Sequence, residues 1–192
     1  EGESIPIDLI RCNDFYCINM INVGLDCDVV EKVNQIKTKT VIKGPMAYAA
    51  GVGAVFMKNR GIDLCLSIDA GESFHEYFTL VAVGNGSFCG GGFKGVPLAK
   101  PDDGLLDISL IRKVNRHTFL SLIGSYHKGT HLDHEKAKEV ISYLQCKSLL
   151  LSAPGELPLK LCIDGEVRTL SKAQIEIIPG KIRFSLPRSF AD

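Results

Sequence analysis

The sequence predicts an α+β domain that is mainly β, an antiparallel β-sandwich-like domain with a few helices. Many apolar runs follow one another at short spacing, most densely after residue 145, as in antiparallel sheets. Few segments have helical periodicity, and the βαβ alternation of a nucleotide-binding parallel sheet is missing. A length of 192 residues, without an internal repeat or an evident linker, fits a single domain over 1–192.

Apolar periodicity and turn residues define the expected elements. Asp26 or Asp28 could cap the first helix, and Pro45 suits the first turn of the second. Pro179-Gly180 joins two alternating runs and predicts a hairpin. Residues 140–144 (VISYL) could form a strand in place of the end of a helix. In chain order the expected elements are strand 16–23, helix 25–39, a helix from 45 to 59, strands 63–68, 74–83 and 106–111, helices 117–126 and 132–144, and strands 146–153, 159–163, 167–171, 174–178 and 181–186.

The charge balance and the apolar pattern exclude several classes of protein. The 22 basic and 22 acidic side chains give zero formal net charge, which excludes the broad basic field of a protein that grips a nucleic-acid backbone. We therefore expect no nucleic-acid partner, although a local basic patch is not excluded. No stretch approaches the roughly 18 apolar residues of a membrane span. The N-terminus is not a secretory signal, and the absence of an initiator Met indicates a piece of a longer chain. Seven cysteines without a CxxC predict reduced, buried thiols in a cytoplasmic protein.

The glycine-rich stretch 84–92 raises the question of a phosphate-binding loop. Such a loop lies between a strand and the N-terminus of a helix, so that backbone N–H groups face the phosphate. Here Pro97 and a second strand follow the glycines, and no Walker lysine-serine pair is present. The sequence therefore favours turns or bulges over a phosphate loop.

Two acidic turns have both a structural and a chemical interpretation. KPDDG places Asp102 and Asp103 together in a β-turn, where a carboxylate and backbone carbonyls could also bind Mg²⁺. Asp164-Gly165 is a strong hairpin signal between alternating runs. With Glu166 it also forms a carboxylate pair, in which one oxygen could accept the proton of an attacking alcohol.

Three histidines have a spacing that superficially suggests zinc. His127, His131 and His134 follow an HxxxHxxH pattern, but Gly129 and Thr130 interrupt the segment. We expect a solvent-exposed helix entry here.

The motifs INVGLDCDV, VAVGNGSFCGGGF, P-x-A-K-P-DDG-LLD and CIDGE occur in this order, within a resemblance that extends from about Ile7 to Leu186. As an ordered set they resemble the C-terminal domain of bacterial lipid kinases of the diacylglycerol kinase catalytic family, distant relatives of the sphingosine kinases and NAD kinases. The GGDGT-type nucleotide motif of that family's N-terminal domain does not occur in this sequence. The resemblance therefore implies the second domain alone, with the N-terminal nucleotide-binding α/β domain absent.

The resemblance also implies roles for particular residues. The KPDDGL turn would bind a structural Mg²⁺ through the Asp103 carboxylate and the backbone carbonyls of Lys100 and Leu105. The tip of the DGE hairpin would reach an interdomain cleft, with Glu166 as the general base and Asp164 as its catalytic neighbour. The glycines of 84–92 would shape the wall of that cleft. ATP would be bound mainly by the missing domain.

The implied activity is phosphoryl transfer from ATP to the hydroxyl of a diacylglycerol-like lipid. We expect a cytoplasmic protein that binds transiently to the inner face of the membrane. Its expected partners are the lipid, ATP and the membrane surface, and a homodimer is a further possibility. The sandwich or the helix at 45–57 would line an apolar slot for the lipid. The alternatives are a non-catalytic β-sandwich binding module, or a kinase of the same family that acts on NAD or a sphingoid base.

Overall fold

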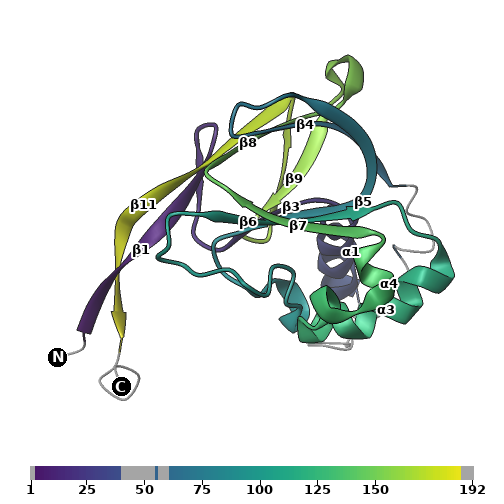
Figure 1. Ribbon diagram of the computed structural model, residues 1–192, viewed down its shortest axis with the longest axis horizontal. Coiled ribbons are helices and arrows are strands. Elements are labelled where there is room, and N and C mark those ends of the chain that lie inside the picture. The colour runs from purple at the N-terminus through teal and green to yellow at the C-terminus, as the bar shows by residue number, and fades with distance from the viewer. Residues whose placement is uncertain (1–2, 40–54, 56–60, 187–192) are drawn as a thin grey trace.

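One antiparallel sheet that curls on itself dominates the computed structural model, which describes residues 3–39, 55 and 61–186 (Figure 1). Within these residues eleven strands form the sheet in the order β10-β9-β3-β5-β4-β8-β11-β1-β2, with β6 paired to β5 and β7 paired to β6. Every pair is antiparallel. The predicted fold class is confirmed, and the sandwich-like core comes from the curl of a single sheet.

The elements lie close to the expected positions wherever the sequence alternates clearly. The strands are β1 (Glu3–Cys12), β2 (Phe15–Cys17), β3 (Met20–Gly24), β4 (Ile62–Ile68), β5 (Phe74–Gly84), β6 (Leu106–Arg112), β7 (Ile141–Cys146), β8 (Ser148–Ser152), β9 (Leu159–Ile163), β10 (Glu166–Leu170) and β11 (Lys172–Leu186). The helices are α1 (Leu25–Lys39), α3 (Arg116–Lys128) and α4 (Glu135–Lys138), with 3₁₀ turns η1 (Gly90–Gly92), η2 (His131–Asp133) and η3 (Pro154–Glu156).

Two long strands connect the two halves of the curled sheet, because each pairs with different neighbours along its length. β5 pairs with β4 through residues 74–78 and with β3 and β6 through residues 80–84. β11 pairs with β8 through residues 172–176 and with β1 through residues 175–186. Side chains alternate between the two faces of a strand, and those that enter the main core from these strands are Phe78, Val81, Val83, Ala173, Ile175 and Ile177. Its largest fully buried members include Phe78, Ile21, Leu64, Leu106, Leu161 and Ile175.

The predicted hairpin at Pro179-Gly180 is wrong, because β11 continues through this dipeptide. β1 runs antiparallel to it on both sides, with Ile7 opposite Ile182 and Leu9 opposite Ile178. One residue of β1, Asp8, therefore faces three residues of β11, which makes the dipeptide a β-bulge. Gly180 has φ +59°, a value that glycine adopts without steric cost. The pairing partner β1 had no counterpart among the expected strands.

Two other expectations have clear outcomes, and a third lies almost wholly outside the described residues. Residues 141–144 of VISYL belong to β7, so the strand alternative is confirmed and helix 132–144 reduces to η2 and α4. Neither Asp26 nor Asp28 caps α1, because the helix begins at Leu25. Both carboxylates lie in its first turn, where their negative charge interacts favourably with the helix dipole and stabilises the helix. The helix expected over 45–59 falls outside the described residues except for Val55.

The helices α1, α3 and α4 cover the sheet face opposite the main core (Figure 1). On this face Leu80 of β5 and Ile111 of β6 pack with Leu122, Ala137 and Ile141. α3 has well-formed ends: the Asn115 side chain accepts the Thr118 amide at its start, and left-handed Gly129 ends it. The seven cysteines are all free, and five of them are buried, which confirms the expectation of reduced, buried thiols.

The expectation of a solvent-exposed histidine segment is wrong for His131. His127 is exposed and His134 half-buried, but His131 is fully buried, with its ring 4.7 Å from that of Tyr126. Neither ring nitrogen of His131 makes a well-formed hydrogen bond to the described residues. Among these residues no group of three or more His, Cys, Asp or Glu side chains could hold a metal ion, so zinc remains unsupported here.

Acidification is expected to destabilise the protein through His131. Burial lowers the pKa of His131 to about 4, although the Ser125 backbone and the Asp133 carboxylate act in the opposite direction. The neutral imidazole is favoured in the folded state, so its contribution is complete above the unfolded pKa of roughly 6.5 and is lost as the pH falls toward 4. The loss at pH 4 is about 3 kcal/mol. Urea unfolding of wild type and His131→Leu between pH 7 and pH 4 measures it. As the pH falls from 7 to 4, wild type should lose about 3 kcal/mol of stability relative to His131→Leu, and parallel curves would contradict the assignment.

Candidate functional site

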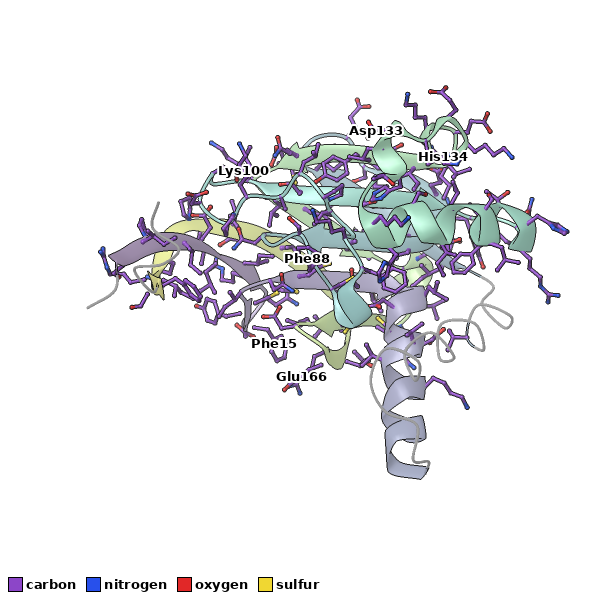
Figure 2. The ribbon with its side chains drawn as sticks, turned by 90° about the horizontal axis from the view of Figure 1, so that it is seen from below. Phe15, Phe88, Lys100, Asp133, His134 and Glu166 are labelled. Atoms are coloured by element: carbon purple, nitrogen blue, oxygen red, sulfur yellow. The ribbon has the colours of Figure 1, made fainter. Side chains whose placement is uncertain are left out.

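The DGE segment forms the tip of the hairpin that joins β9 to β10, as the sequence predicted. Glu166 pairs with Ile163, so Asp164 and Gly165 alone make the turn. Both have positive φ, +45° and +90°, as the two central positions of a type I′ turn require. The hairpin lies at the edge of the sheet, and its tip projects from that edge (Figure 2).

Asp164 holds the neighbouring β2–β3 turn. Its Oδ2 accepts the Ile18 amide at 2.8 Å, and its Oδ1 accepts the amides of Asn19 and Met20 and the Cys17 thiol at 3.0–3.1 Å. The Asp164 amide donates in return to the Met20 carbonyl at 3.0 Å. Both carboxylate oxygens of Asp164 are therefore engaged by the β2–β3 turn.

Glu166 has the opposite character. Its side chain is 71% exposed, and its recorded partner is the Arg168 guanidinium two residues along β10. With Phe15 and Tyr16 these two residues line an open hollow, and Phe15 and Glu166 lie close together in Figure 2. The Arg168 guanidinium also stacks 5.5 Å from the centre of the Phe15 ring. The sequence analysis missed Arg168, whose spacing from Glu166 places both side chains on one face of the strand.

The KPDDG turn lies away from this hairpin, with Lys100 well separated from Glu166 in Figure 2. Asp103 is exposed, and its Oδ1 accepts the Leu105 amide at 3.1 Å. Its Oδ2 makes no hydrogen bond to the described residues. One free carboxylate oxygen and the carbonyls of a tight turn are hard oxygen donors, so the donor set suits Mg²⁺.

Asp8, which the sequence analysis missed, supports the KPDDG turn from beneath. It is only 2% exposed. Its Oδ2 accepts the Gly104 amide and its Oδ1 accepts the Gly180 amide, each at 2.7 Å, and its own amide donates to the Pro101 carbonyl at 2.7 Å. A single buried carboxylate therefore joins the KPDDG turn to the β11 bulge. Asp8 lies opposite the bulge, between the paired residues Ile7 and Leu9. Interpreting Pro179-Gly180 as a bulge would therefore have pointed to Asp8.

Negative charge accumulates at this corner. Asp107 is fully buried, and burial raises the pKa of its carboxyl; hydrogen bonds from Tyr143 and Gln145 act against that shift, and the Asp103 carboxylate adds to it. The Tyr143 hydroxyl donates to Asp107 Oδ1 at 2.6 Å. A cation at Asp103 would relieve the repulsion between Asp103 and Asp107.

Asn85, in the glycine-rich stretch, forms hydrogen bonds toward both acidic turns. Asn85 is 1% exposed, and its Nδ2 donates to the Asp8 carbonyl at 3.0 Å and to the Ile18 carbonyl at 3.1 Å. The amides of Asn85 and Gly86 both donate to the Asn19 carbonyl. Since Ile18 in turn donates to Asp164, contacts run from the KPDDG corner to the DGE hairpin. The expectation of turns in this stretch is confirmed, with η1 as one short turn.

An apolar groove lies on the other side of the sheet, between α1 and α3. The face of α3 that lines it has helical spacing, with Phe119, Leu122, Ile123 and Tyr126. α1 contributes Leu25, Asp26 and Val29. Asn22 on β3 donates from Nδ2 to Asp26 Oδ2 at 2.8 Å. The groove is thus apolar along its length and polar at the end near Asn22. The sequence analysis named no residues for such a slot.

The curled antiparallel sheet with few helices defines a β-sandwich-like domain, and the carboxylate hairpin lies at the edge of that sheet. A family model described as the YegS C-terminal NAD kinase β-sandwich-like domain matches residues 19–185. This chain belongs to that family.

Relatives in sequence carry lipid-kinase names. A probable lipid kinase YegS-like from Shewanella frigidimarina is 30% identical over 190 residues, which cover 97% of this chain and 57% of that protein. A diacylglycerol kinase from Staphylococcus carnosus is 28% identical over 166 residues, covering 86% and 51%. The chain thus spans between half and three fifths of the length of these relatives.

Solved structures support the same fold. A putative diacylglycerol kinase from Bacillus anthracis superposes with a TM-score of 0.67 at 22% identity, over 97% of this chain and 59% of that one. A second structure of a diacylglycerol kinase from the same organism gives 0.64 at 19% identity. In residues 3–39, 55 and 61–186, no helix is both long and apolar enough to cross a membrane.

Proposed function

We propose that this chain is the lipid-binding and catalytic-base domain of an ATP-dependent kinase that phosphorylates the hydroxyl of a diacylglycerol-like lipid. The observation that carries the proposal is the contrast between the two carboxylates of the DGE hairpin. Both oxygens of Asp164 accept hydrogen bonds from the β2–β3 turn, whereas the Glu166 carboxylate is exposed and lines an open hollow beside the same hairpin. Membership of a family whose relatives bear lipid-kinase names supports the choice of substrate class.

The chemistry assigned to Glu166 is removal of a proton. An alcohol attacks a phosphoryl group more readily when a carboxylate accepts its proton within hydrogen-bonding distance. Asp164 fixes the hairpin, and Arg168 beside Glu166 supplies a cation that can orient the carboxylate or meet a phosphate oxygen. ATP would be held mainly by a nucleotide-binding domain beyond this chain. The lipid would be met at the membrane surface, in transient contact with the inner face.

A magnesium ion at the KPDDG turn is part of the proposal. Asp103 would bind it through its carboxylate, and Lys100 and Leu105 through their backbone carbonyls. The ion would supply positive charge that braces the turn between Asp103 and Asp107. Because this corner lies apart from Glu166, its role would be structural.

Loss of one charged ligand oxygen should reveal this ion. In wild type, millimolar Mg²⁺ is expected to raise the melting temperature by a few degrees, since a ligand that binds only the folded state stabilises it. Asp103→Asn should lose most of this gain, whereas Asp102→Asn, on the exposed neighbour, should keep it. Differential scanning calorimetry with and without Mg²⁺ measures both. If the two variants respond to Mg²⁺ like wild type, the aspartates are ordinary turn residues.

The 192-residue chain alone is expected to transfer no phosphate to lipid. Its glycine-rich stretch contains the short 3₁₀ turn η1 and not the start of an α-helix that could cradle a nucleotide, and phosphoryl transfer depends mainly on positioning the phosphates. Radiolabelled ATP, Mg²⁺ and diacylglycerol vesicles provide the assay. Joining the chain to a nucleotide-binding domain should restore activity. Robust turnover by the chain alone would refute the two-domain proposal.

A further inference from the structure

Four large apolar side chains on three neighbouring loops are more than half exposed. Single exposed apolar residues are ordinary on a protein surface, but several in one region mark an interaction site. The four, which we call the apolar patch, are Tyr16 and Ile18 at the β2–β3 turn, 60% and 51% exposed, Phe88 in the glycine-rich stretch, 55% exposed, and Leu98 in the loop before the KPDDG turn, 59% exposed.

Hydrogen bonds hold the three loops together. In the β2–β3 turn, Asn19 donates from Nδ2 to the Phe88 carbonyl at 2.8 Å. The Ser87 hydroxyl donates to the Ala99 carbonyl at 3.2 Å, directly beside Leu98. Because each of these bonds joins a residue of the apolar patch, or its immediate neighbour, to the next loop, the four side chains belong to one region of the surface.

Positive charge borders the apolar patch. The Lys94 ammonium lies 5.1 Å from the centre of the Phe88 ring. The Lys94 amide donates to the His127 carbonyl at 3.3 Å, which places this lysine against the end of α3, where His127 and Lys128 are exposed. Neither Lys94 nor Lys128 forms an ion pair with another described residue. The charge of both lysines is therefore available to an anionic partner.

This composition favours a lipid bilayer over a protein as the partner. Lysine is depleted at protein–protein interfaces. Surfaces that bind membranes combine aromatic and aliphatic side chains, which enter the interfacial region, with lysines whose ammonium groups stay near the lipid phosphates. Tyr16 also lines the open hollow that contains Glu166, whose own charge is paired with Arg168. A bilayer on the apolar patch would thus lie beside that hollow.

We propose that the apolar patch of Tyr16, Ile18, Phe88 and Leu98, with Lys94 and Lys128 beside it, docks on the surface of an anionic bilayer. The proposal rests on the proposed function and deepens it, because it specifies how the domain meets its lipid. A lipid whose hydroxyl lies at the bilayer surface would reach the Glu166 hollow without crossing water.

A tryptophan reporter tests the contact directly. The chain contains no tryptophan, so one introduced at position 88 reports on that position alone. On addition of vesicles of equal parts phosphatidylcholine and phosphatidylglycerol, Phe88→Trp fluorescence should shift to shorter wavelength, and lipids with brominated acyl chains should quench it. The matched control is Leu157→Trp, because Leu157 is 62% exposed and lies at the opposite end of β9 from Asp164. An equal response at both positions, or none at position 88, would overturn the proposal.

Vesicle flotation of the 192-residue chain separates the apolar and the electrostatic contributions. Phe88→Ser should lower the partition coefficient roughly tenfold, because a large apolar side chain no longer leaves water. Lys94→Gln should lower it roughly fivefold on the anionic vesicles and little on pure phosphatidylcholine. Lys172→Gln changes an exposed lysine at the opposite end of β10 from Glu166 and should have no effect. Wild-type partition of folded Phe88→Ser would overturn the proposal.

The competing occupant is another protein surface, and a protein that joins this chain to a nucleotide-binding domain distinguishes it. Membrane docking requires that the joined protein keep the vesicle response of Phe88→Trp. It also requires that Phe88→Ser leave the melting temperature of the joined protein unchanged. Loss of the vesicle response on joining, together with a lower melting temperature for Phe88→Ser, would overturn membrane docking in favour of an interface between domains.

Docking and catalysis can fail separately, because vesicle binding needs neither ATP nor the Glu166 carboxylate. Glu166→Gln should bind vesicles at least as well as wild type. Vesicle binding combined with full kinase activity of Glu166→Gln would remove the base and keep the docking surface. An inactive Glu166→Gln enzyme whose position 88 does not respond to vesicles would keep the base and overturn the docking surface.

Discussion

Glu166→Gln, in a protein that joins this chain to a nucleotide-binding domain, is expected to lower kcat roughly 10²–10⁴-fold. A lipid hydroxyl is a poor nucleophile until its proton has an acceptor, and glutamine keeps the size and hydrogen-bonding shape of glutamate without its basicity. ATP affinity should stay nearly intact, because the substitution removes only the proton acceptor.

Folding should be insensitive to the same substitution. Glu166 is largely exposed, and its ion pair with Arg168 is a surface contact of a kind worth at most about 1 kcal/mol. The melting temperature should therefore change by only a few degrees at most. Steady-state kinetics and calorimetry on one preparation separate chemistry from stability.

Two variants control this experiment. Glu135→Gln alters another exposed glutamate, which pairs with Lys138 far from the hairpin, and should leave kcat unchanged. Asp164→Asn should lower both stability and activity, because its carboxylate holds the β2–β3 turn. Full activity in a correctly folded Glu166→Gln enzyme would exclude Glu166 as the base. An equal collapse of stability and activity would mean that Glu166 is a structural residue of the hairpin.

Asp8→Asn is expected to lower the free energy of unfolding by about 3 kcal/mol. The two Asp8 oxygens each accept a backbone amide, from Gly104 and Gly180, in a nearly inaccessible position. Asparagine offers one oxygen and an NH₂ group, so one of these amides would face another donor. For a chain of this length the melting temperature should fall by about 6–12 °C.

Urea unfolding measures this loss, with Asp14→Asn as the control. Asp14 is exposed in the turn between β1 and β2, and its substitution should change the free energy of unfolding by less than about 0.5 kcal/mol. The Asp8 variant should also lose the Mg²⁺ response expected of wild type, because Gly104 closes the KPDDG turn. An Asp8→Asn protein as stable as wild type would show that the carboxylate is not needed at the bulge.

Local chemistry made several features predictable. Short apolar runs bounded by turn residues identified β4, β5, β6 and β9, since a strand buried in a sheet needs apolar side chains. Asp164-Gly165 identified the hairpin, because few dipeptides accept two successive positive φ angles. The division of roles within that hairpin was not predictable, since Asp164 bonds the amides of residues 18–20, more than 140 positions away.

Tertiary packing also explains the errors. Pro179-Gly180 has the composition of a tight turn, and only β1, at the opposite end of the chain, makes it a bulge. His131 has polar neighbours in the sequence, but the chain turns back after α3 and packs its ring against Tyr126, which buries it. The bulge depends on a distant strand, whereas the burial of His131 depends on how a nearby turn packs.

By itself the sequence determined the class of fold, the position of the DGE turn and the hard-oxygen character of the KPDDG turn, because propensity, alternation and turn chemistry depend on neighbours in the chain. The tertiary structure alone decided that Asp8 and Asn85 join the two acidic turns, that Glu166 is the exposed carboxylate, and that Asn22 and Tyr126 line the same apolar groove. The physical reason is that burial, hydrogen-bond satisfaction and charge environment are properties of packed surfaces, and these exist only once distant strands pair.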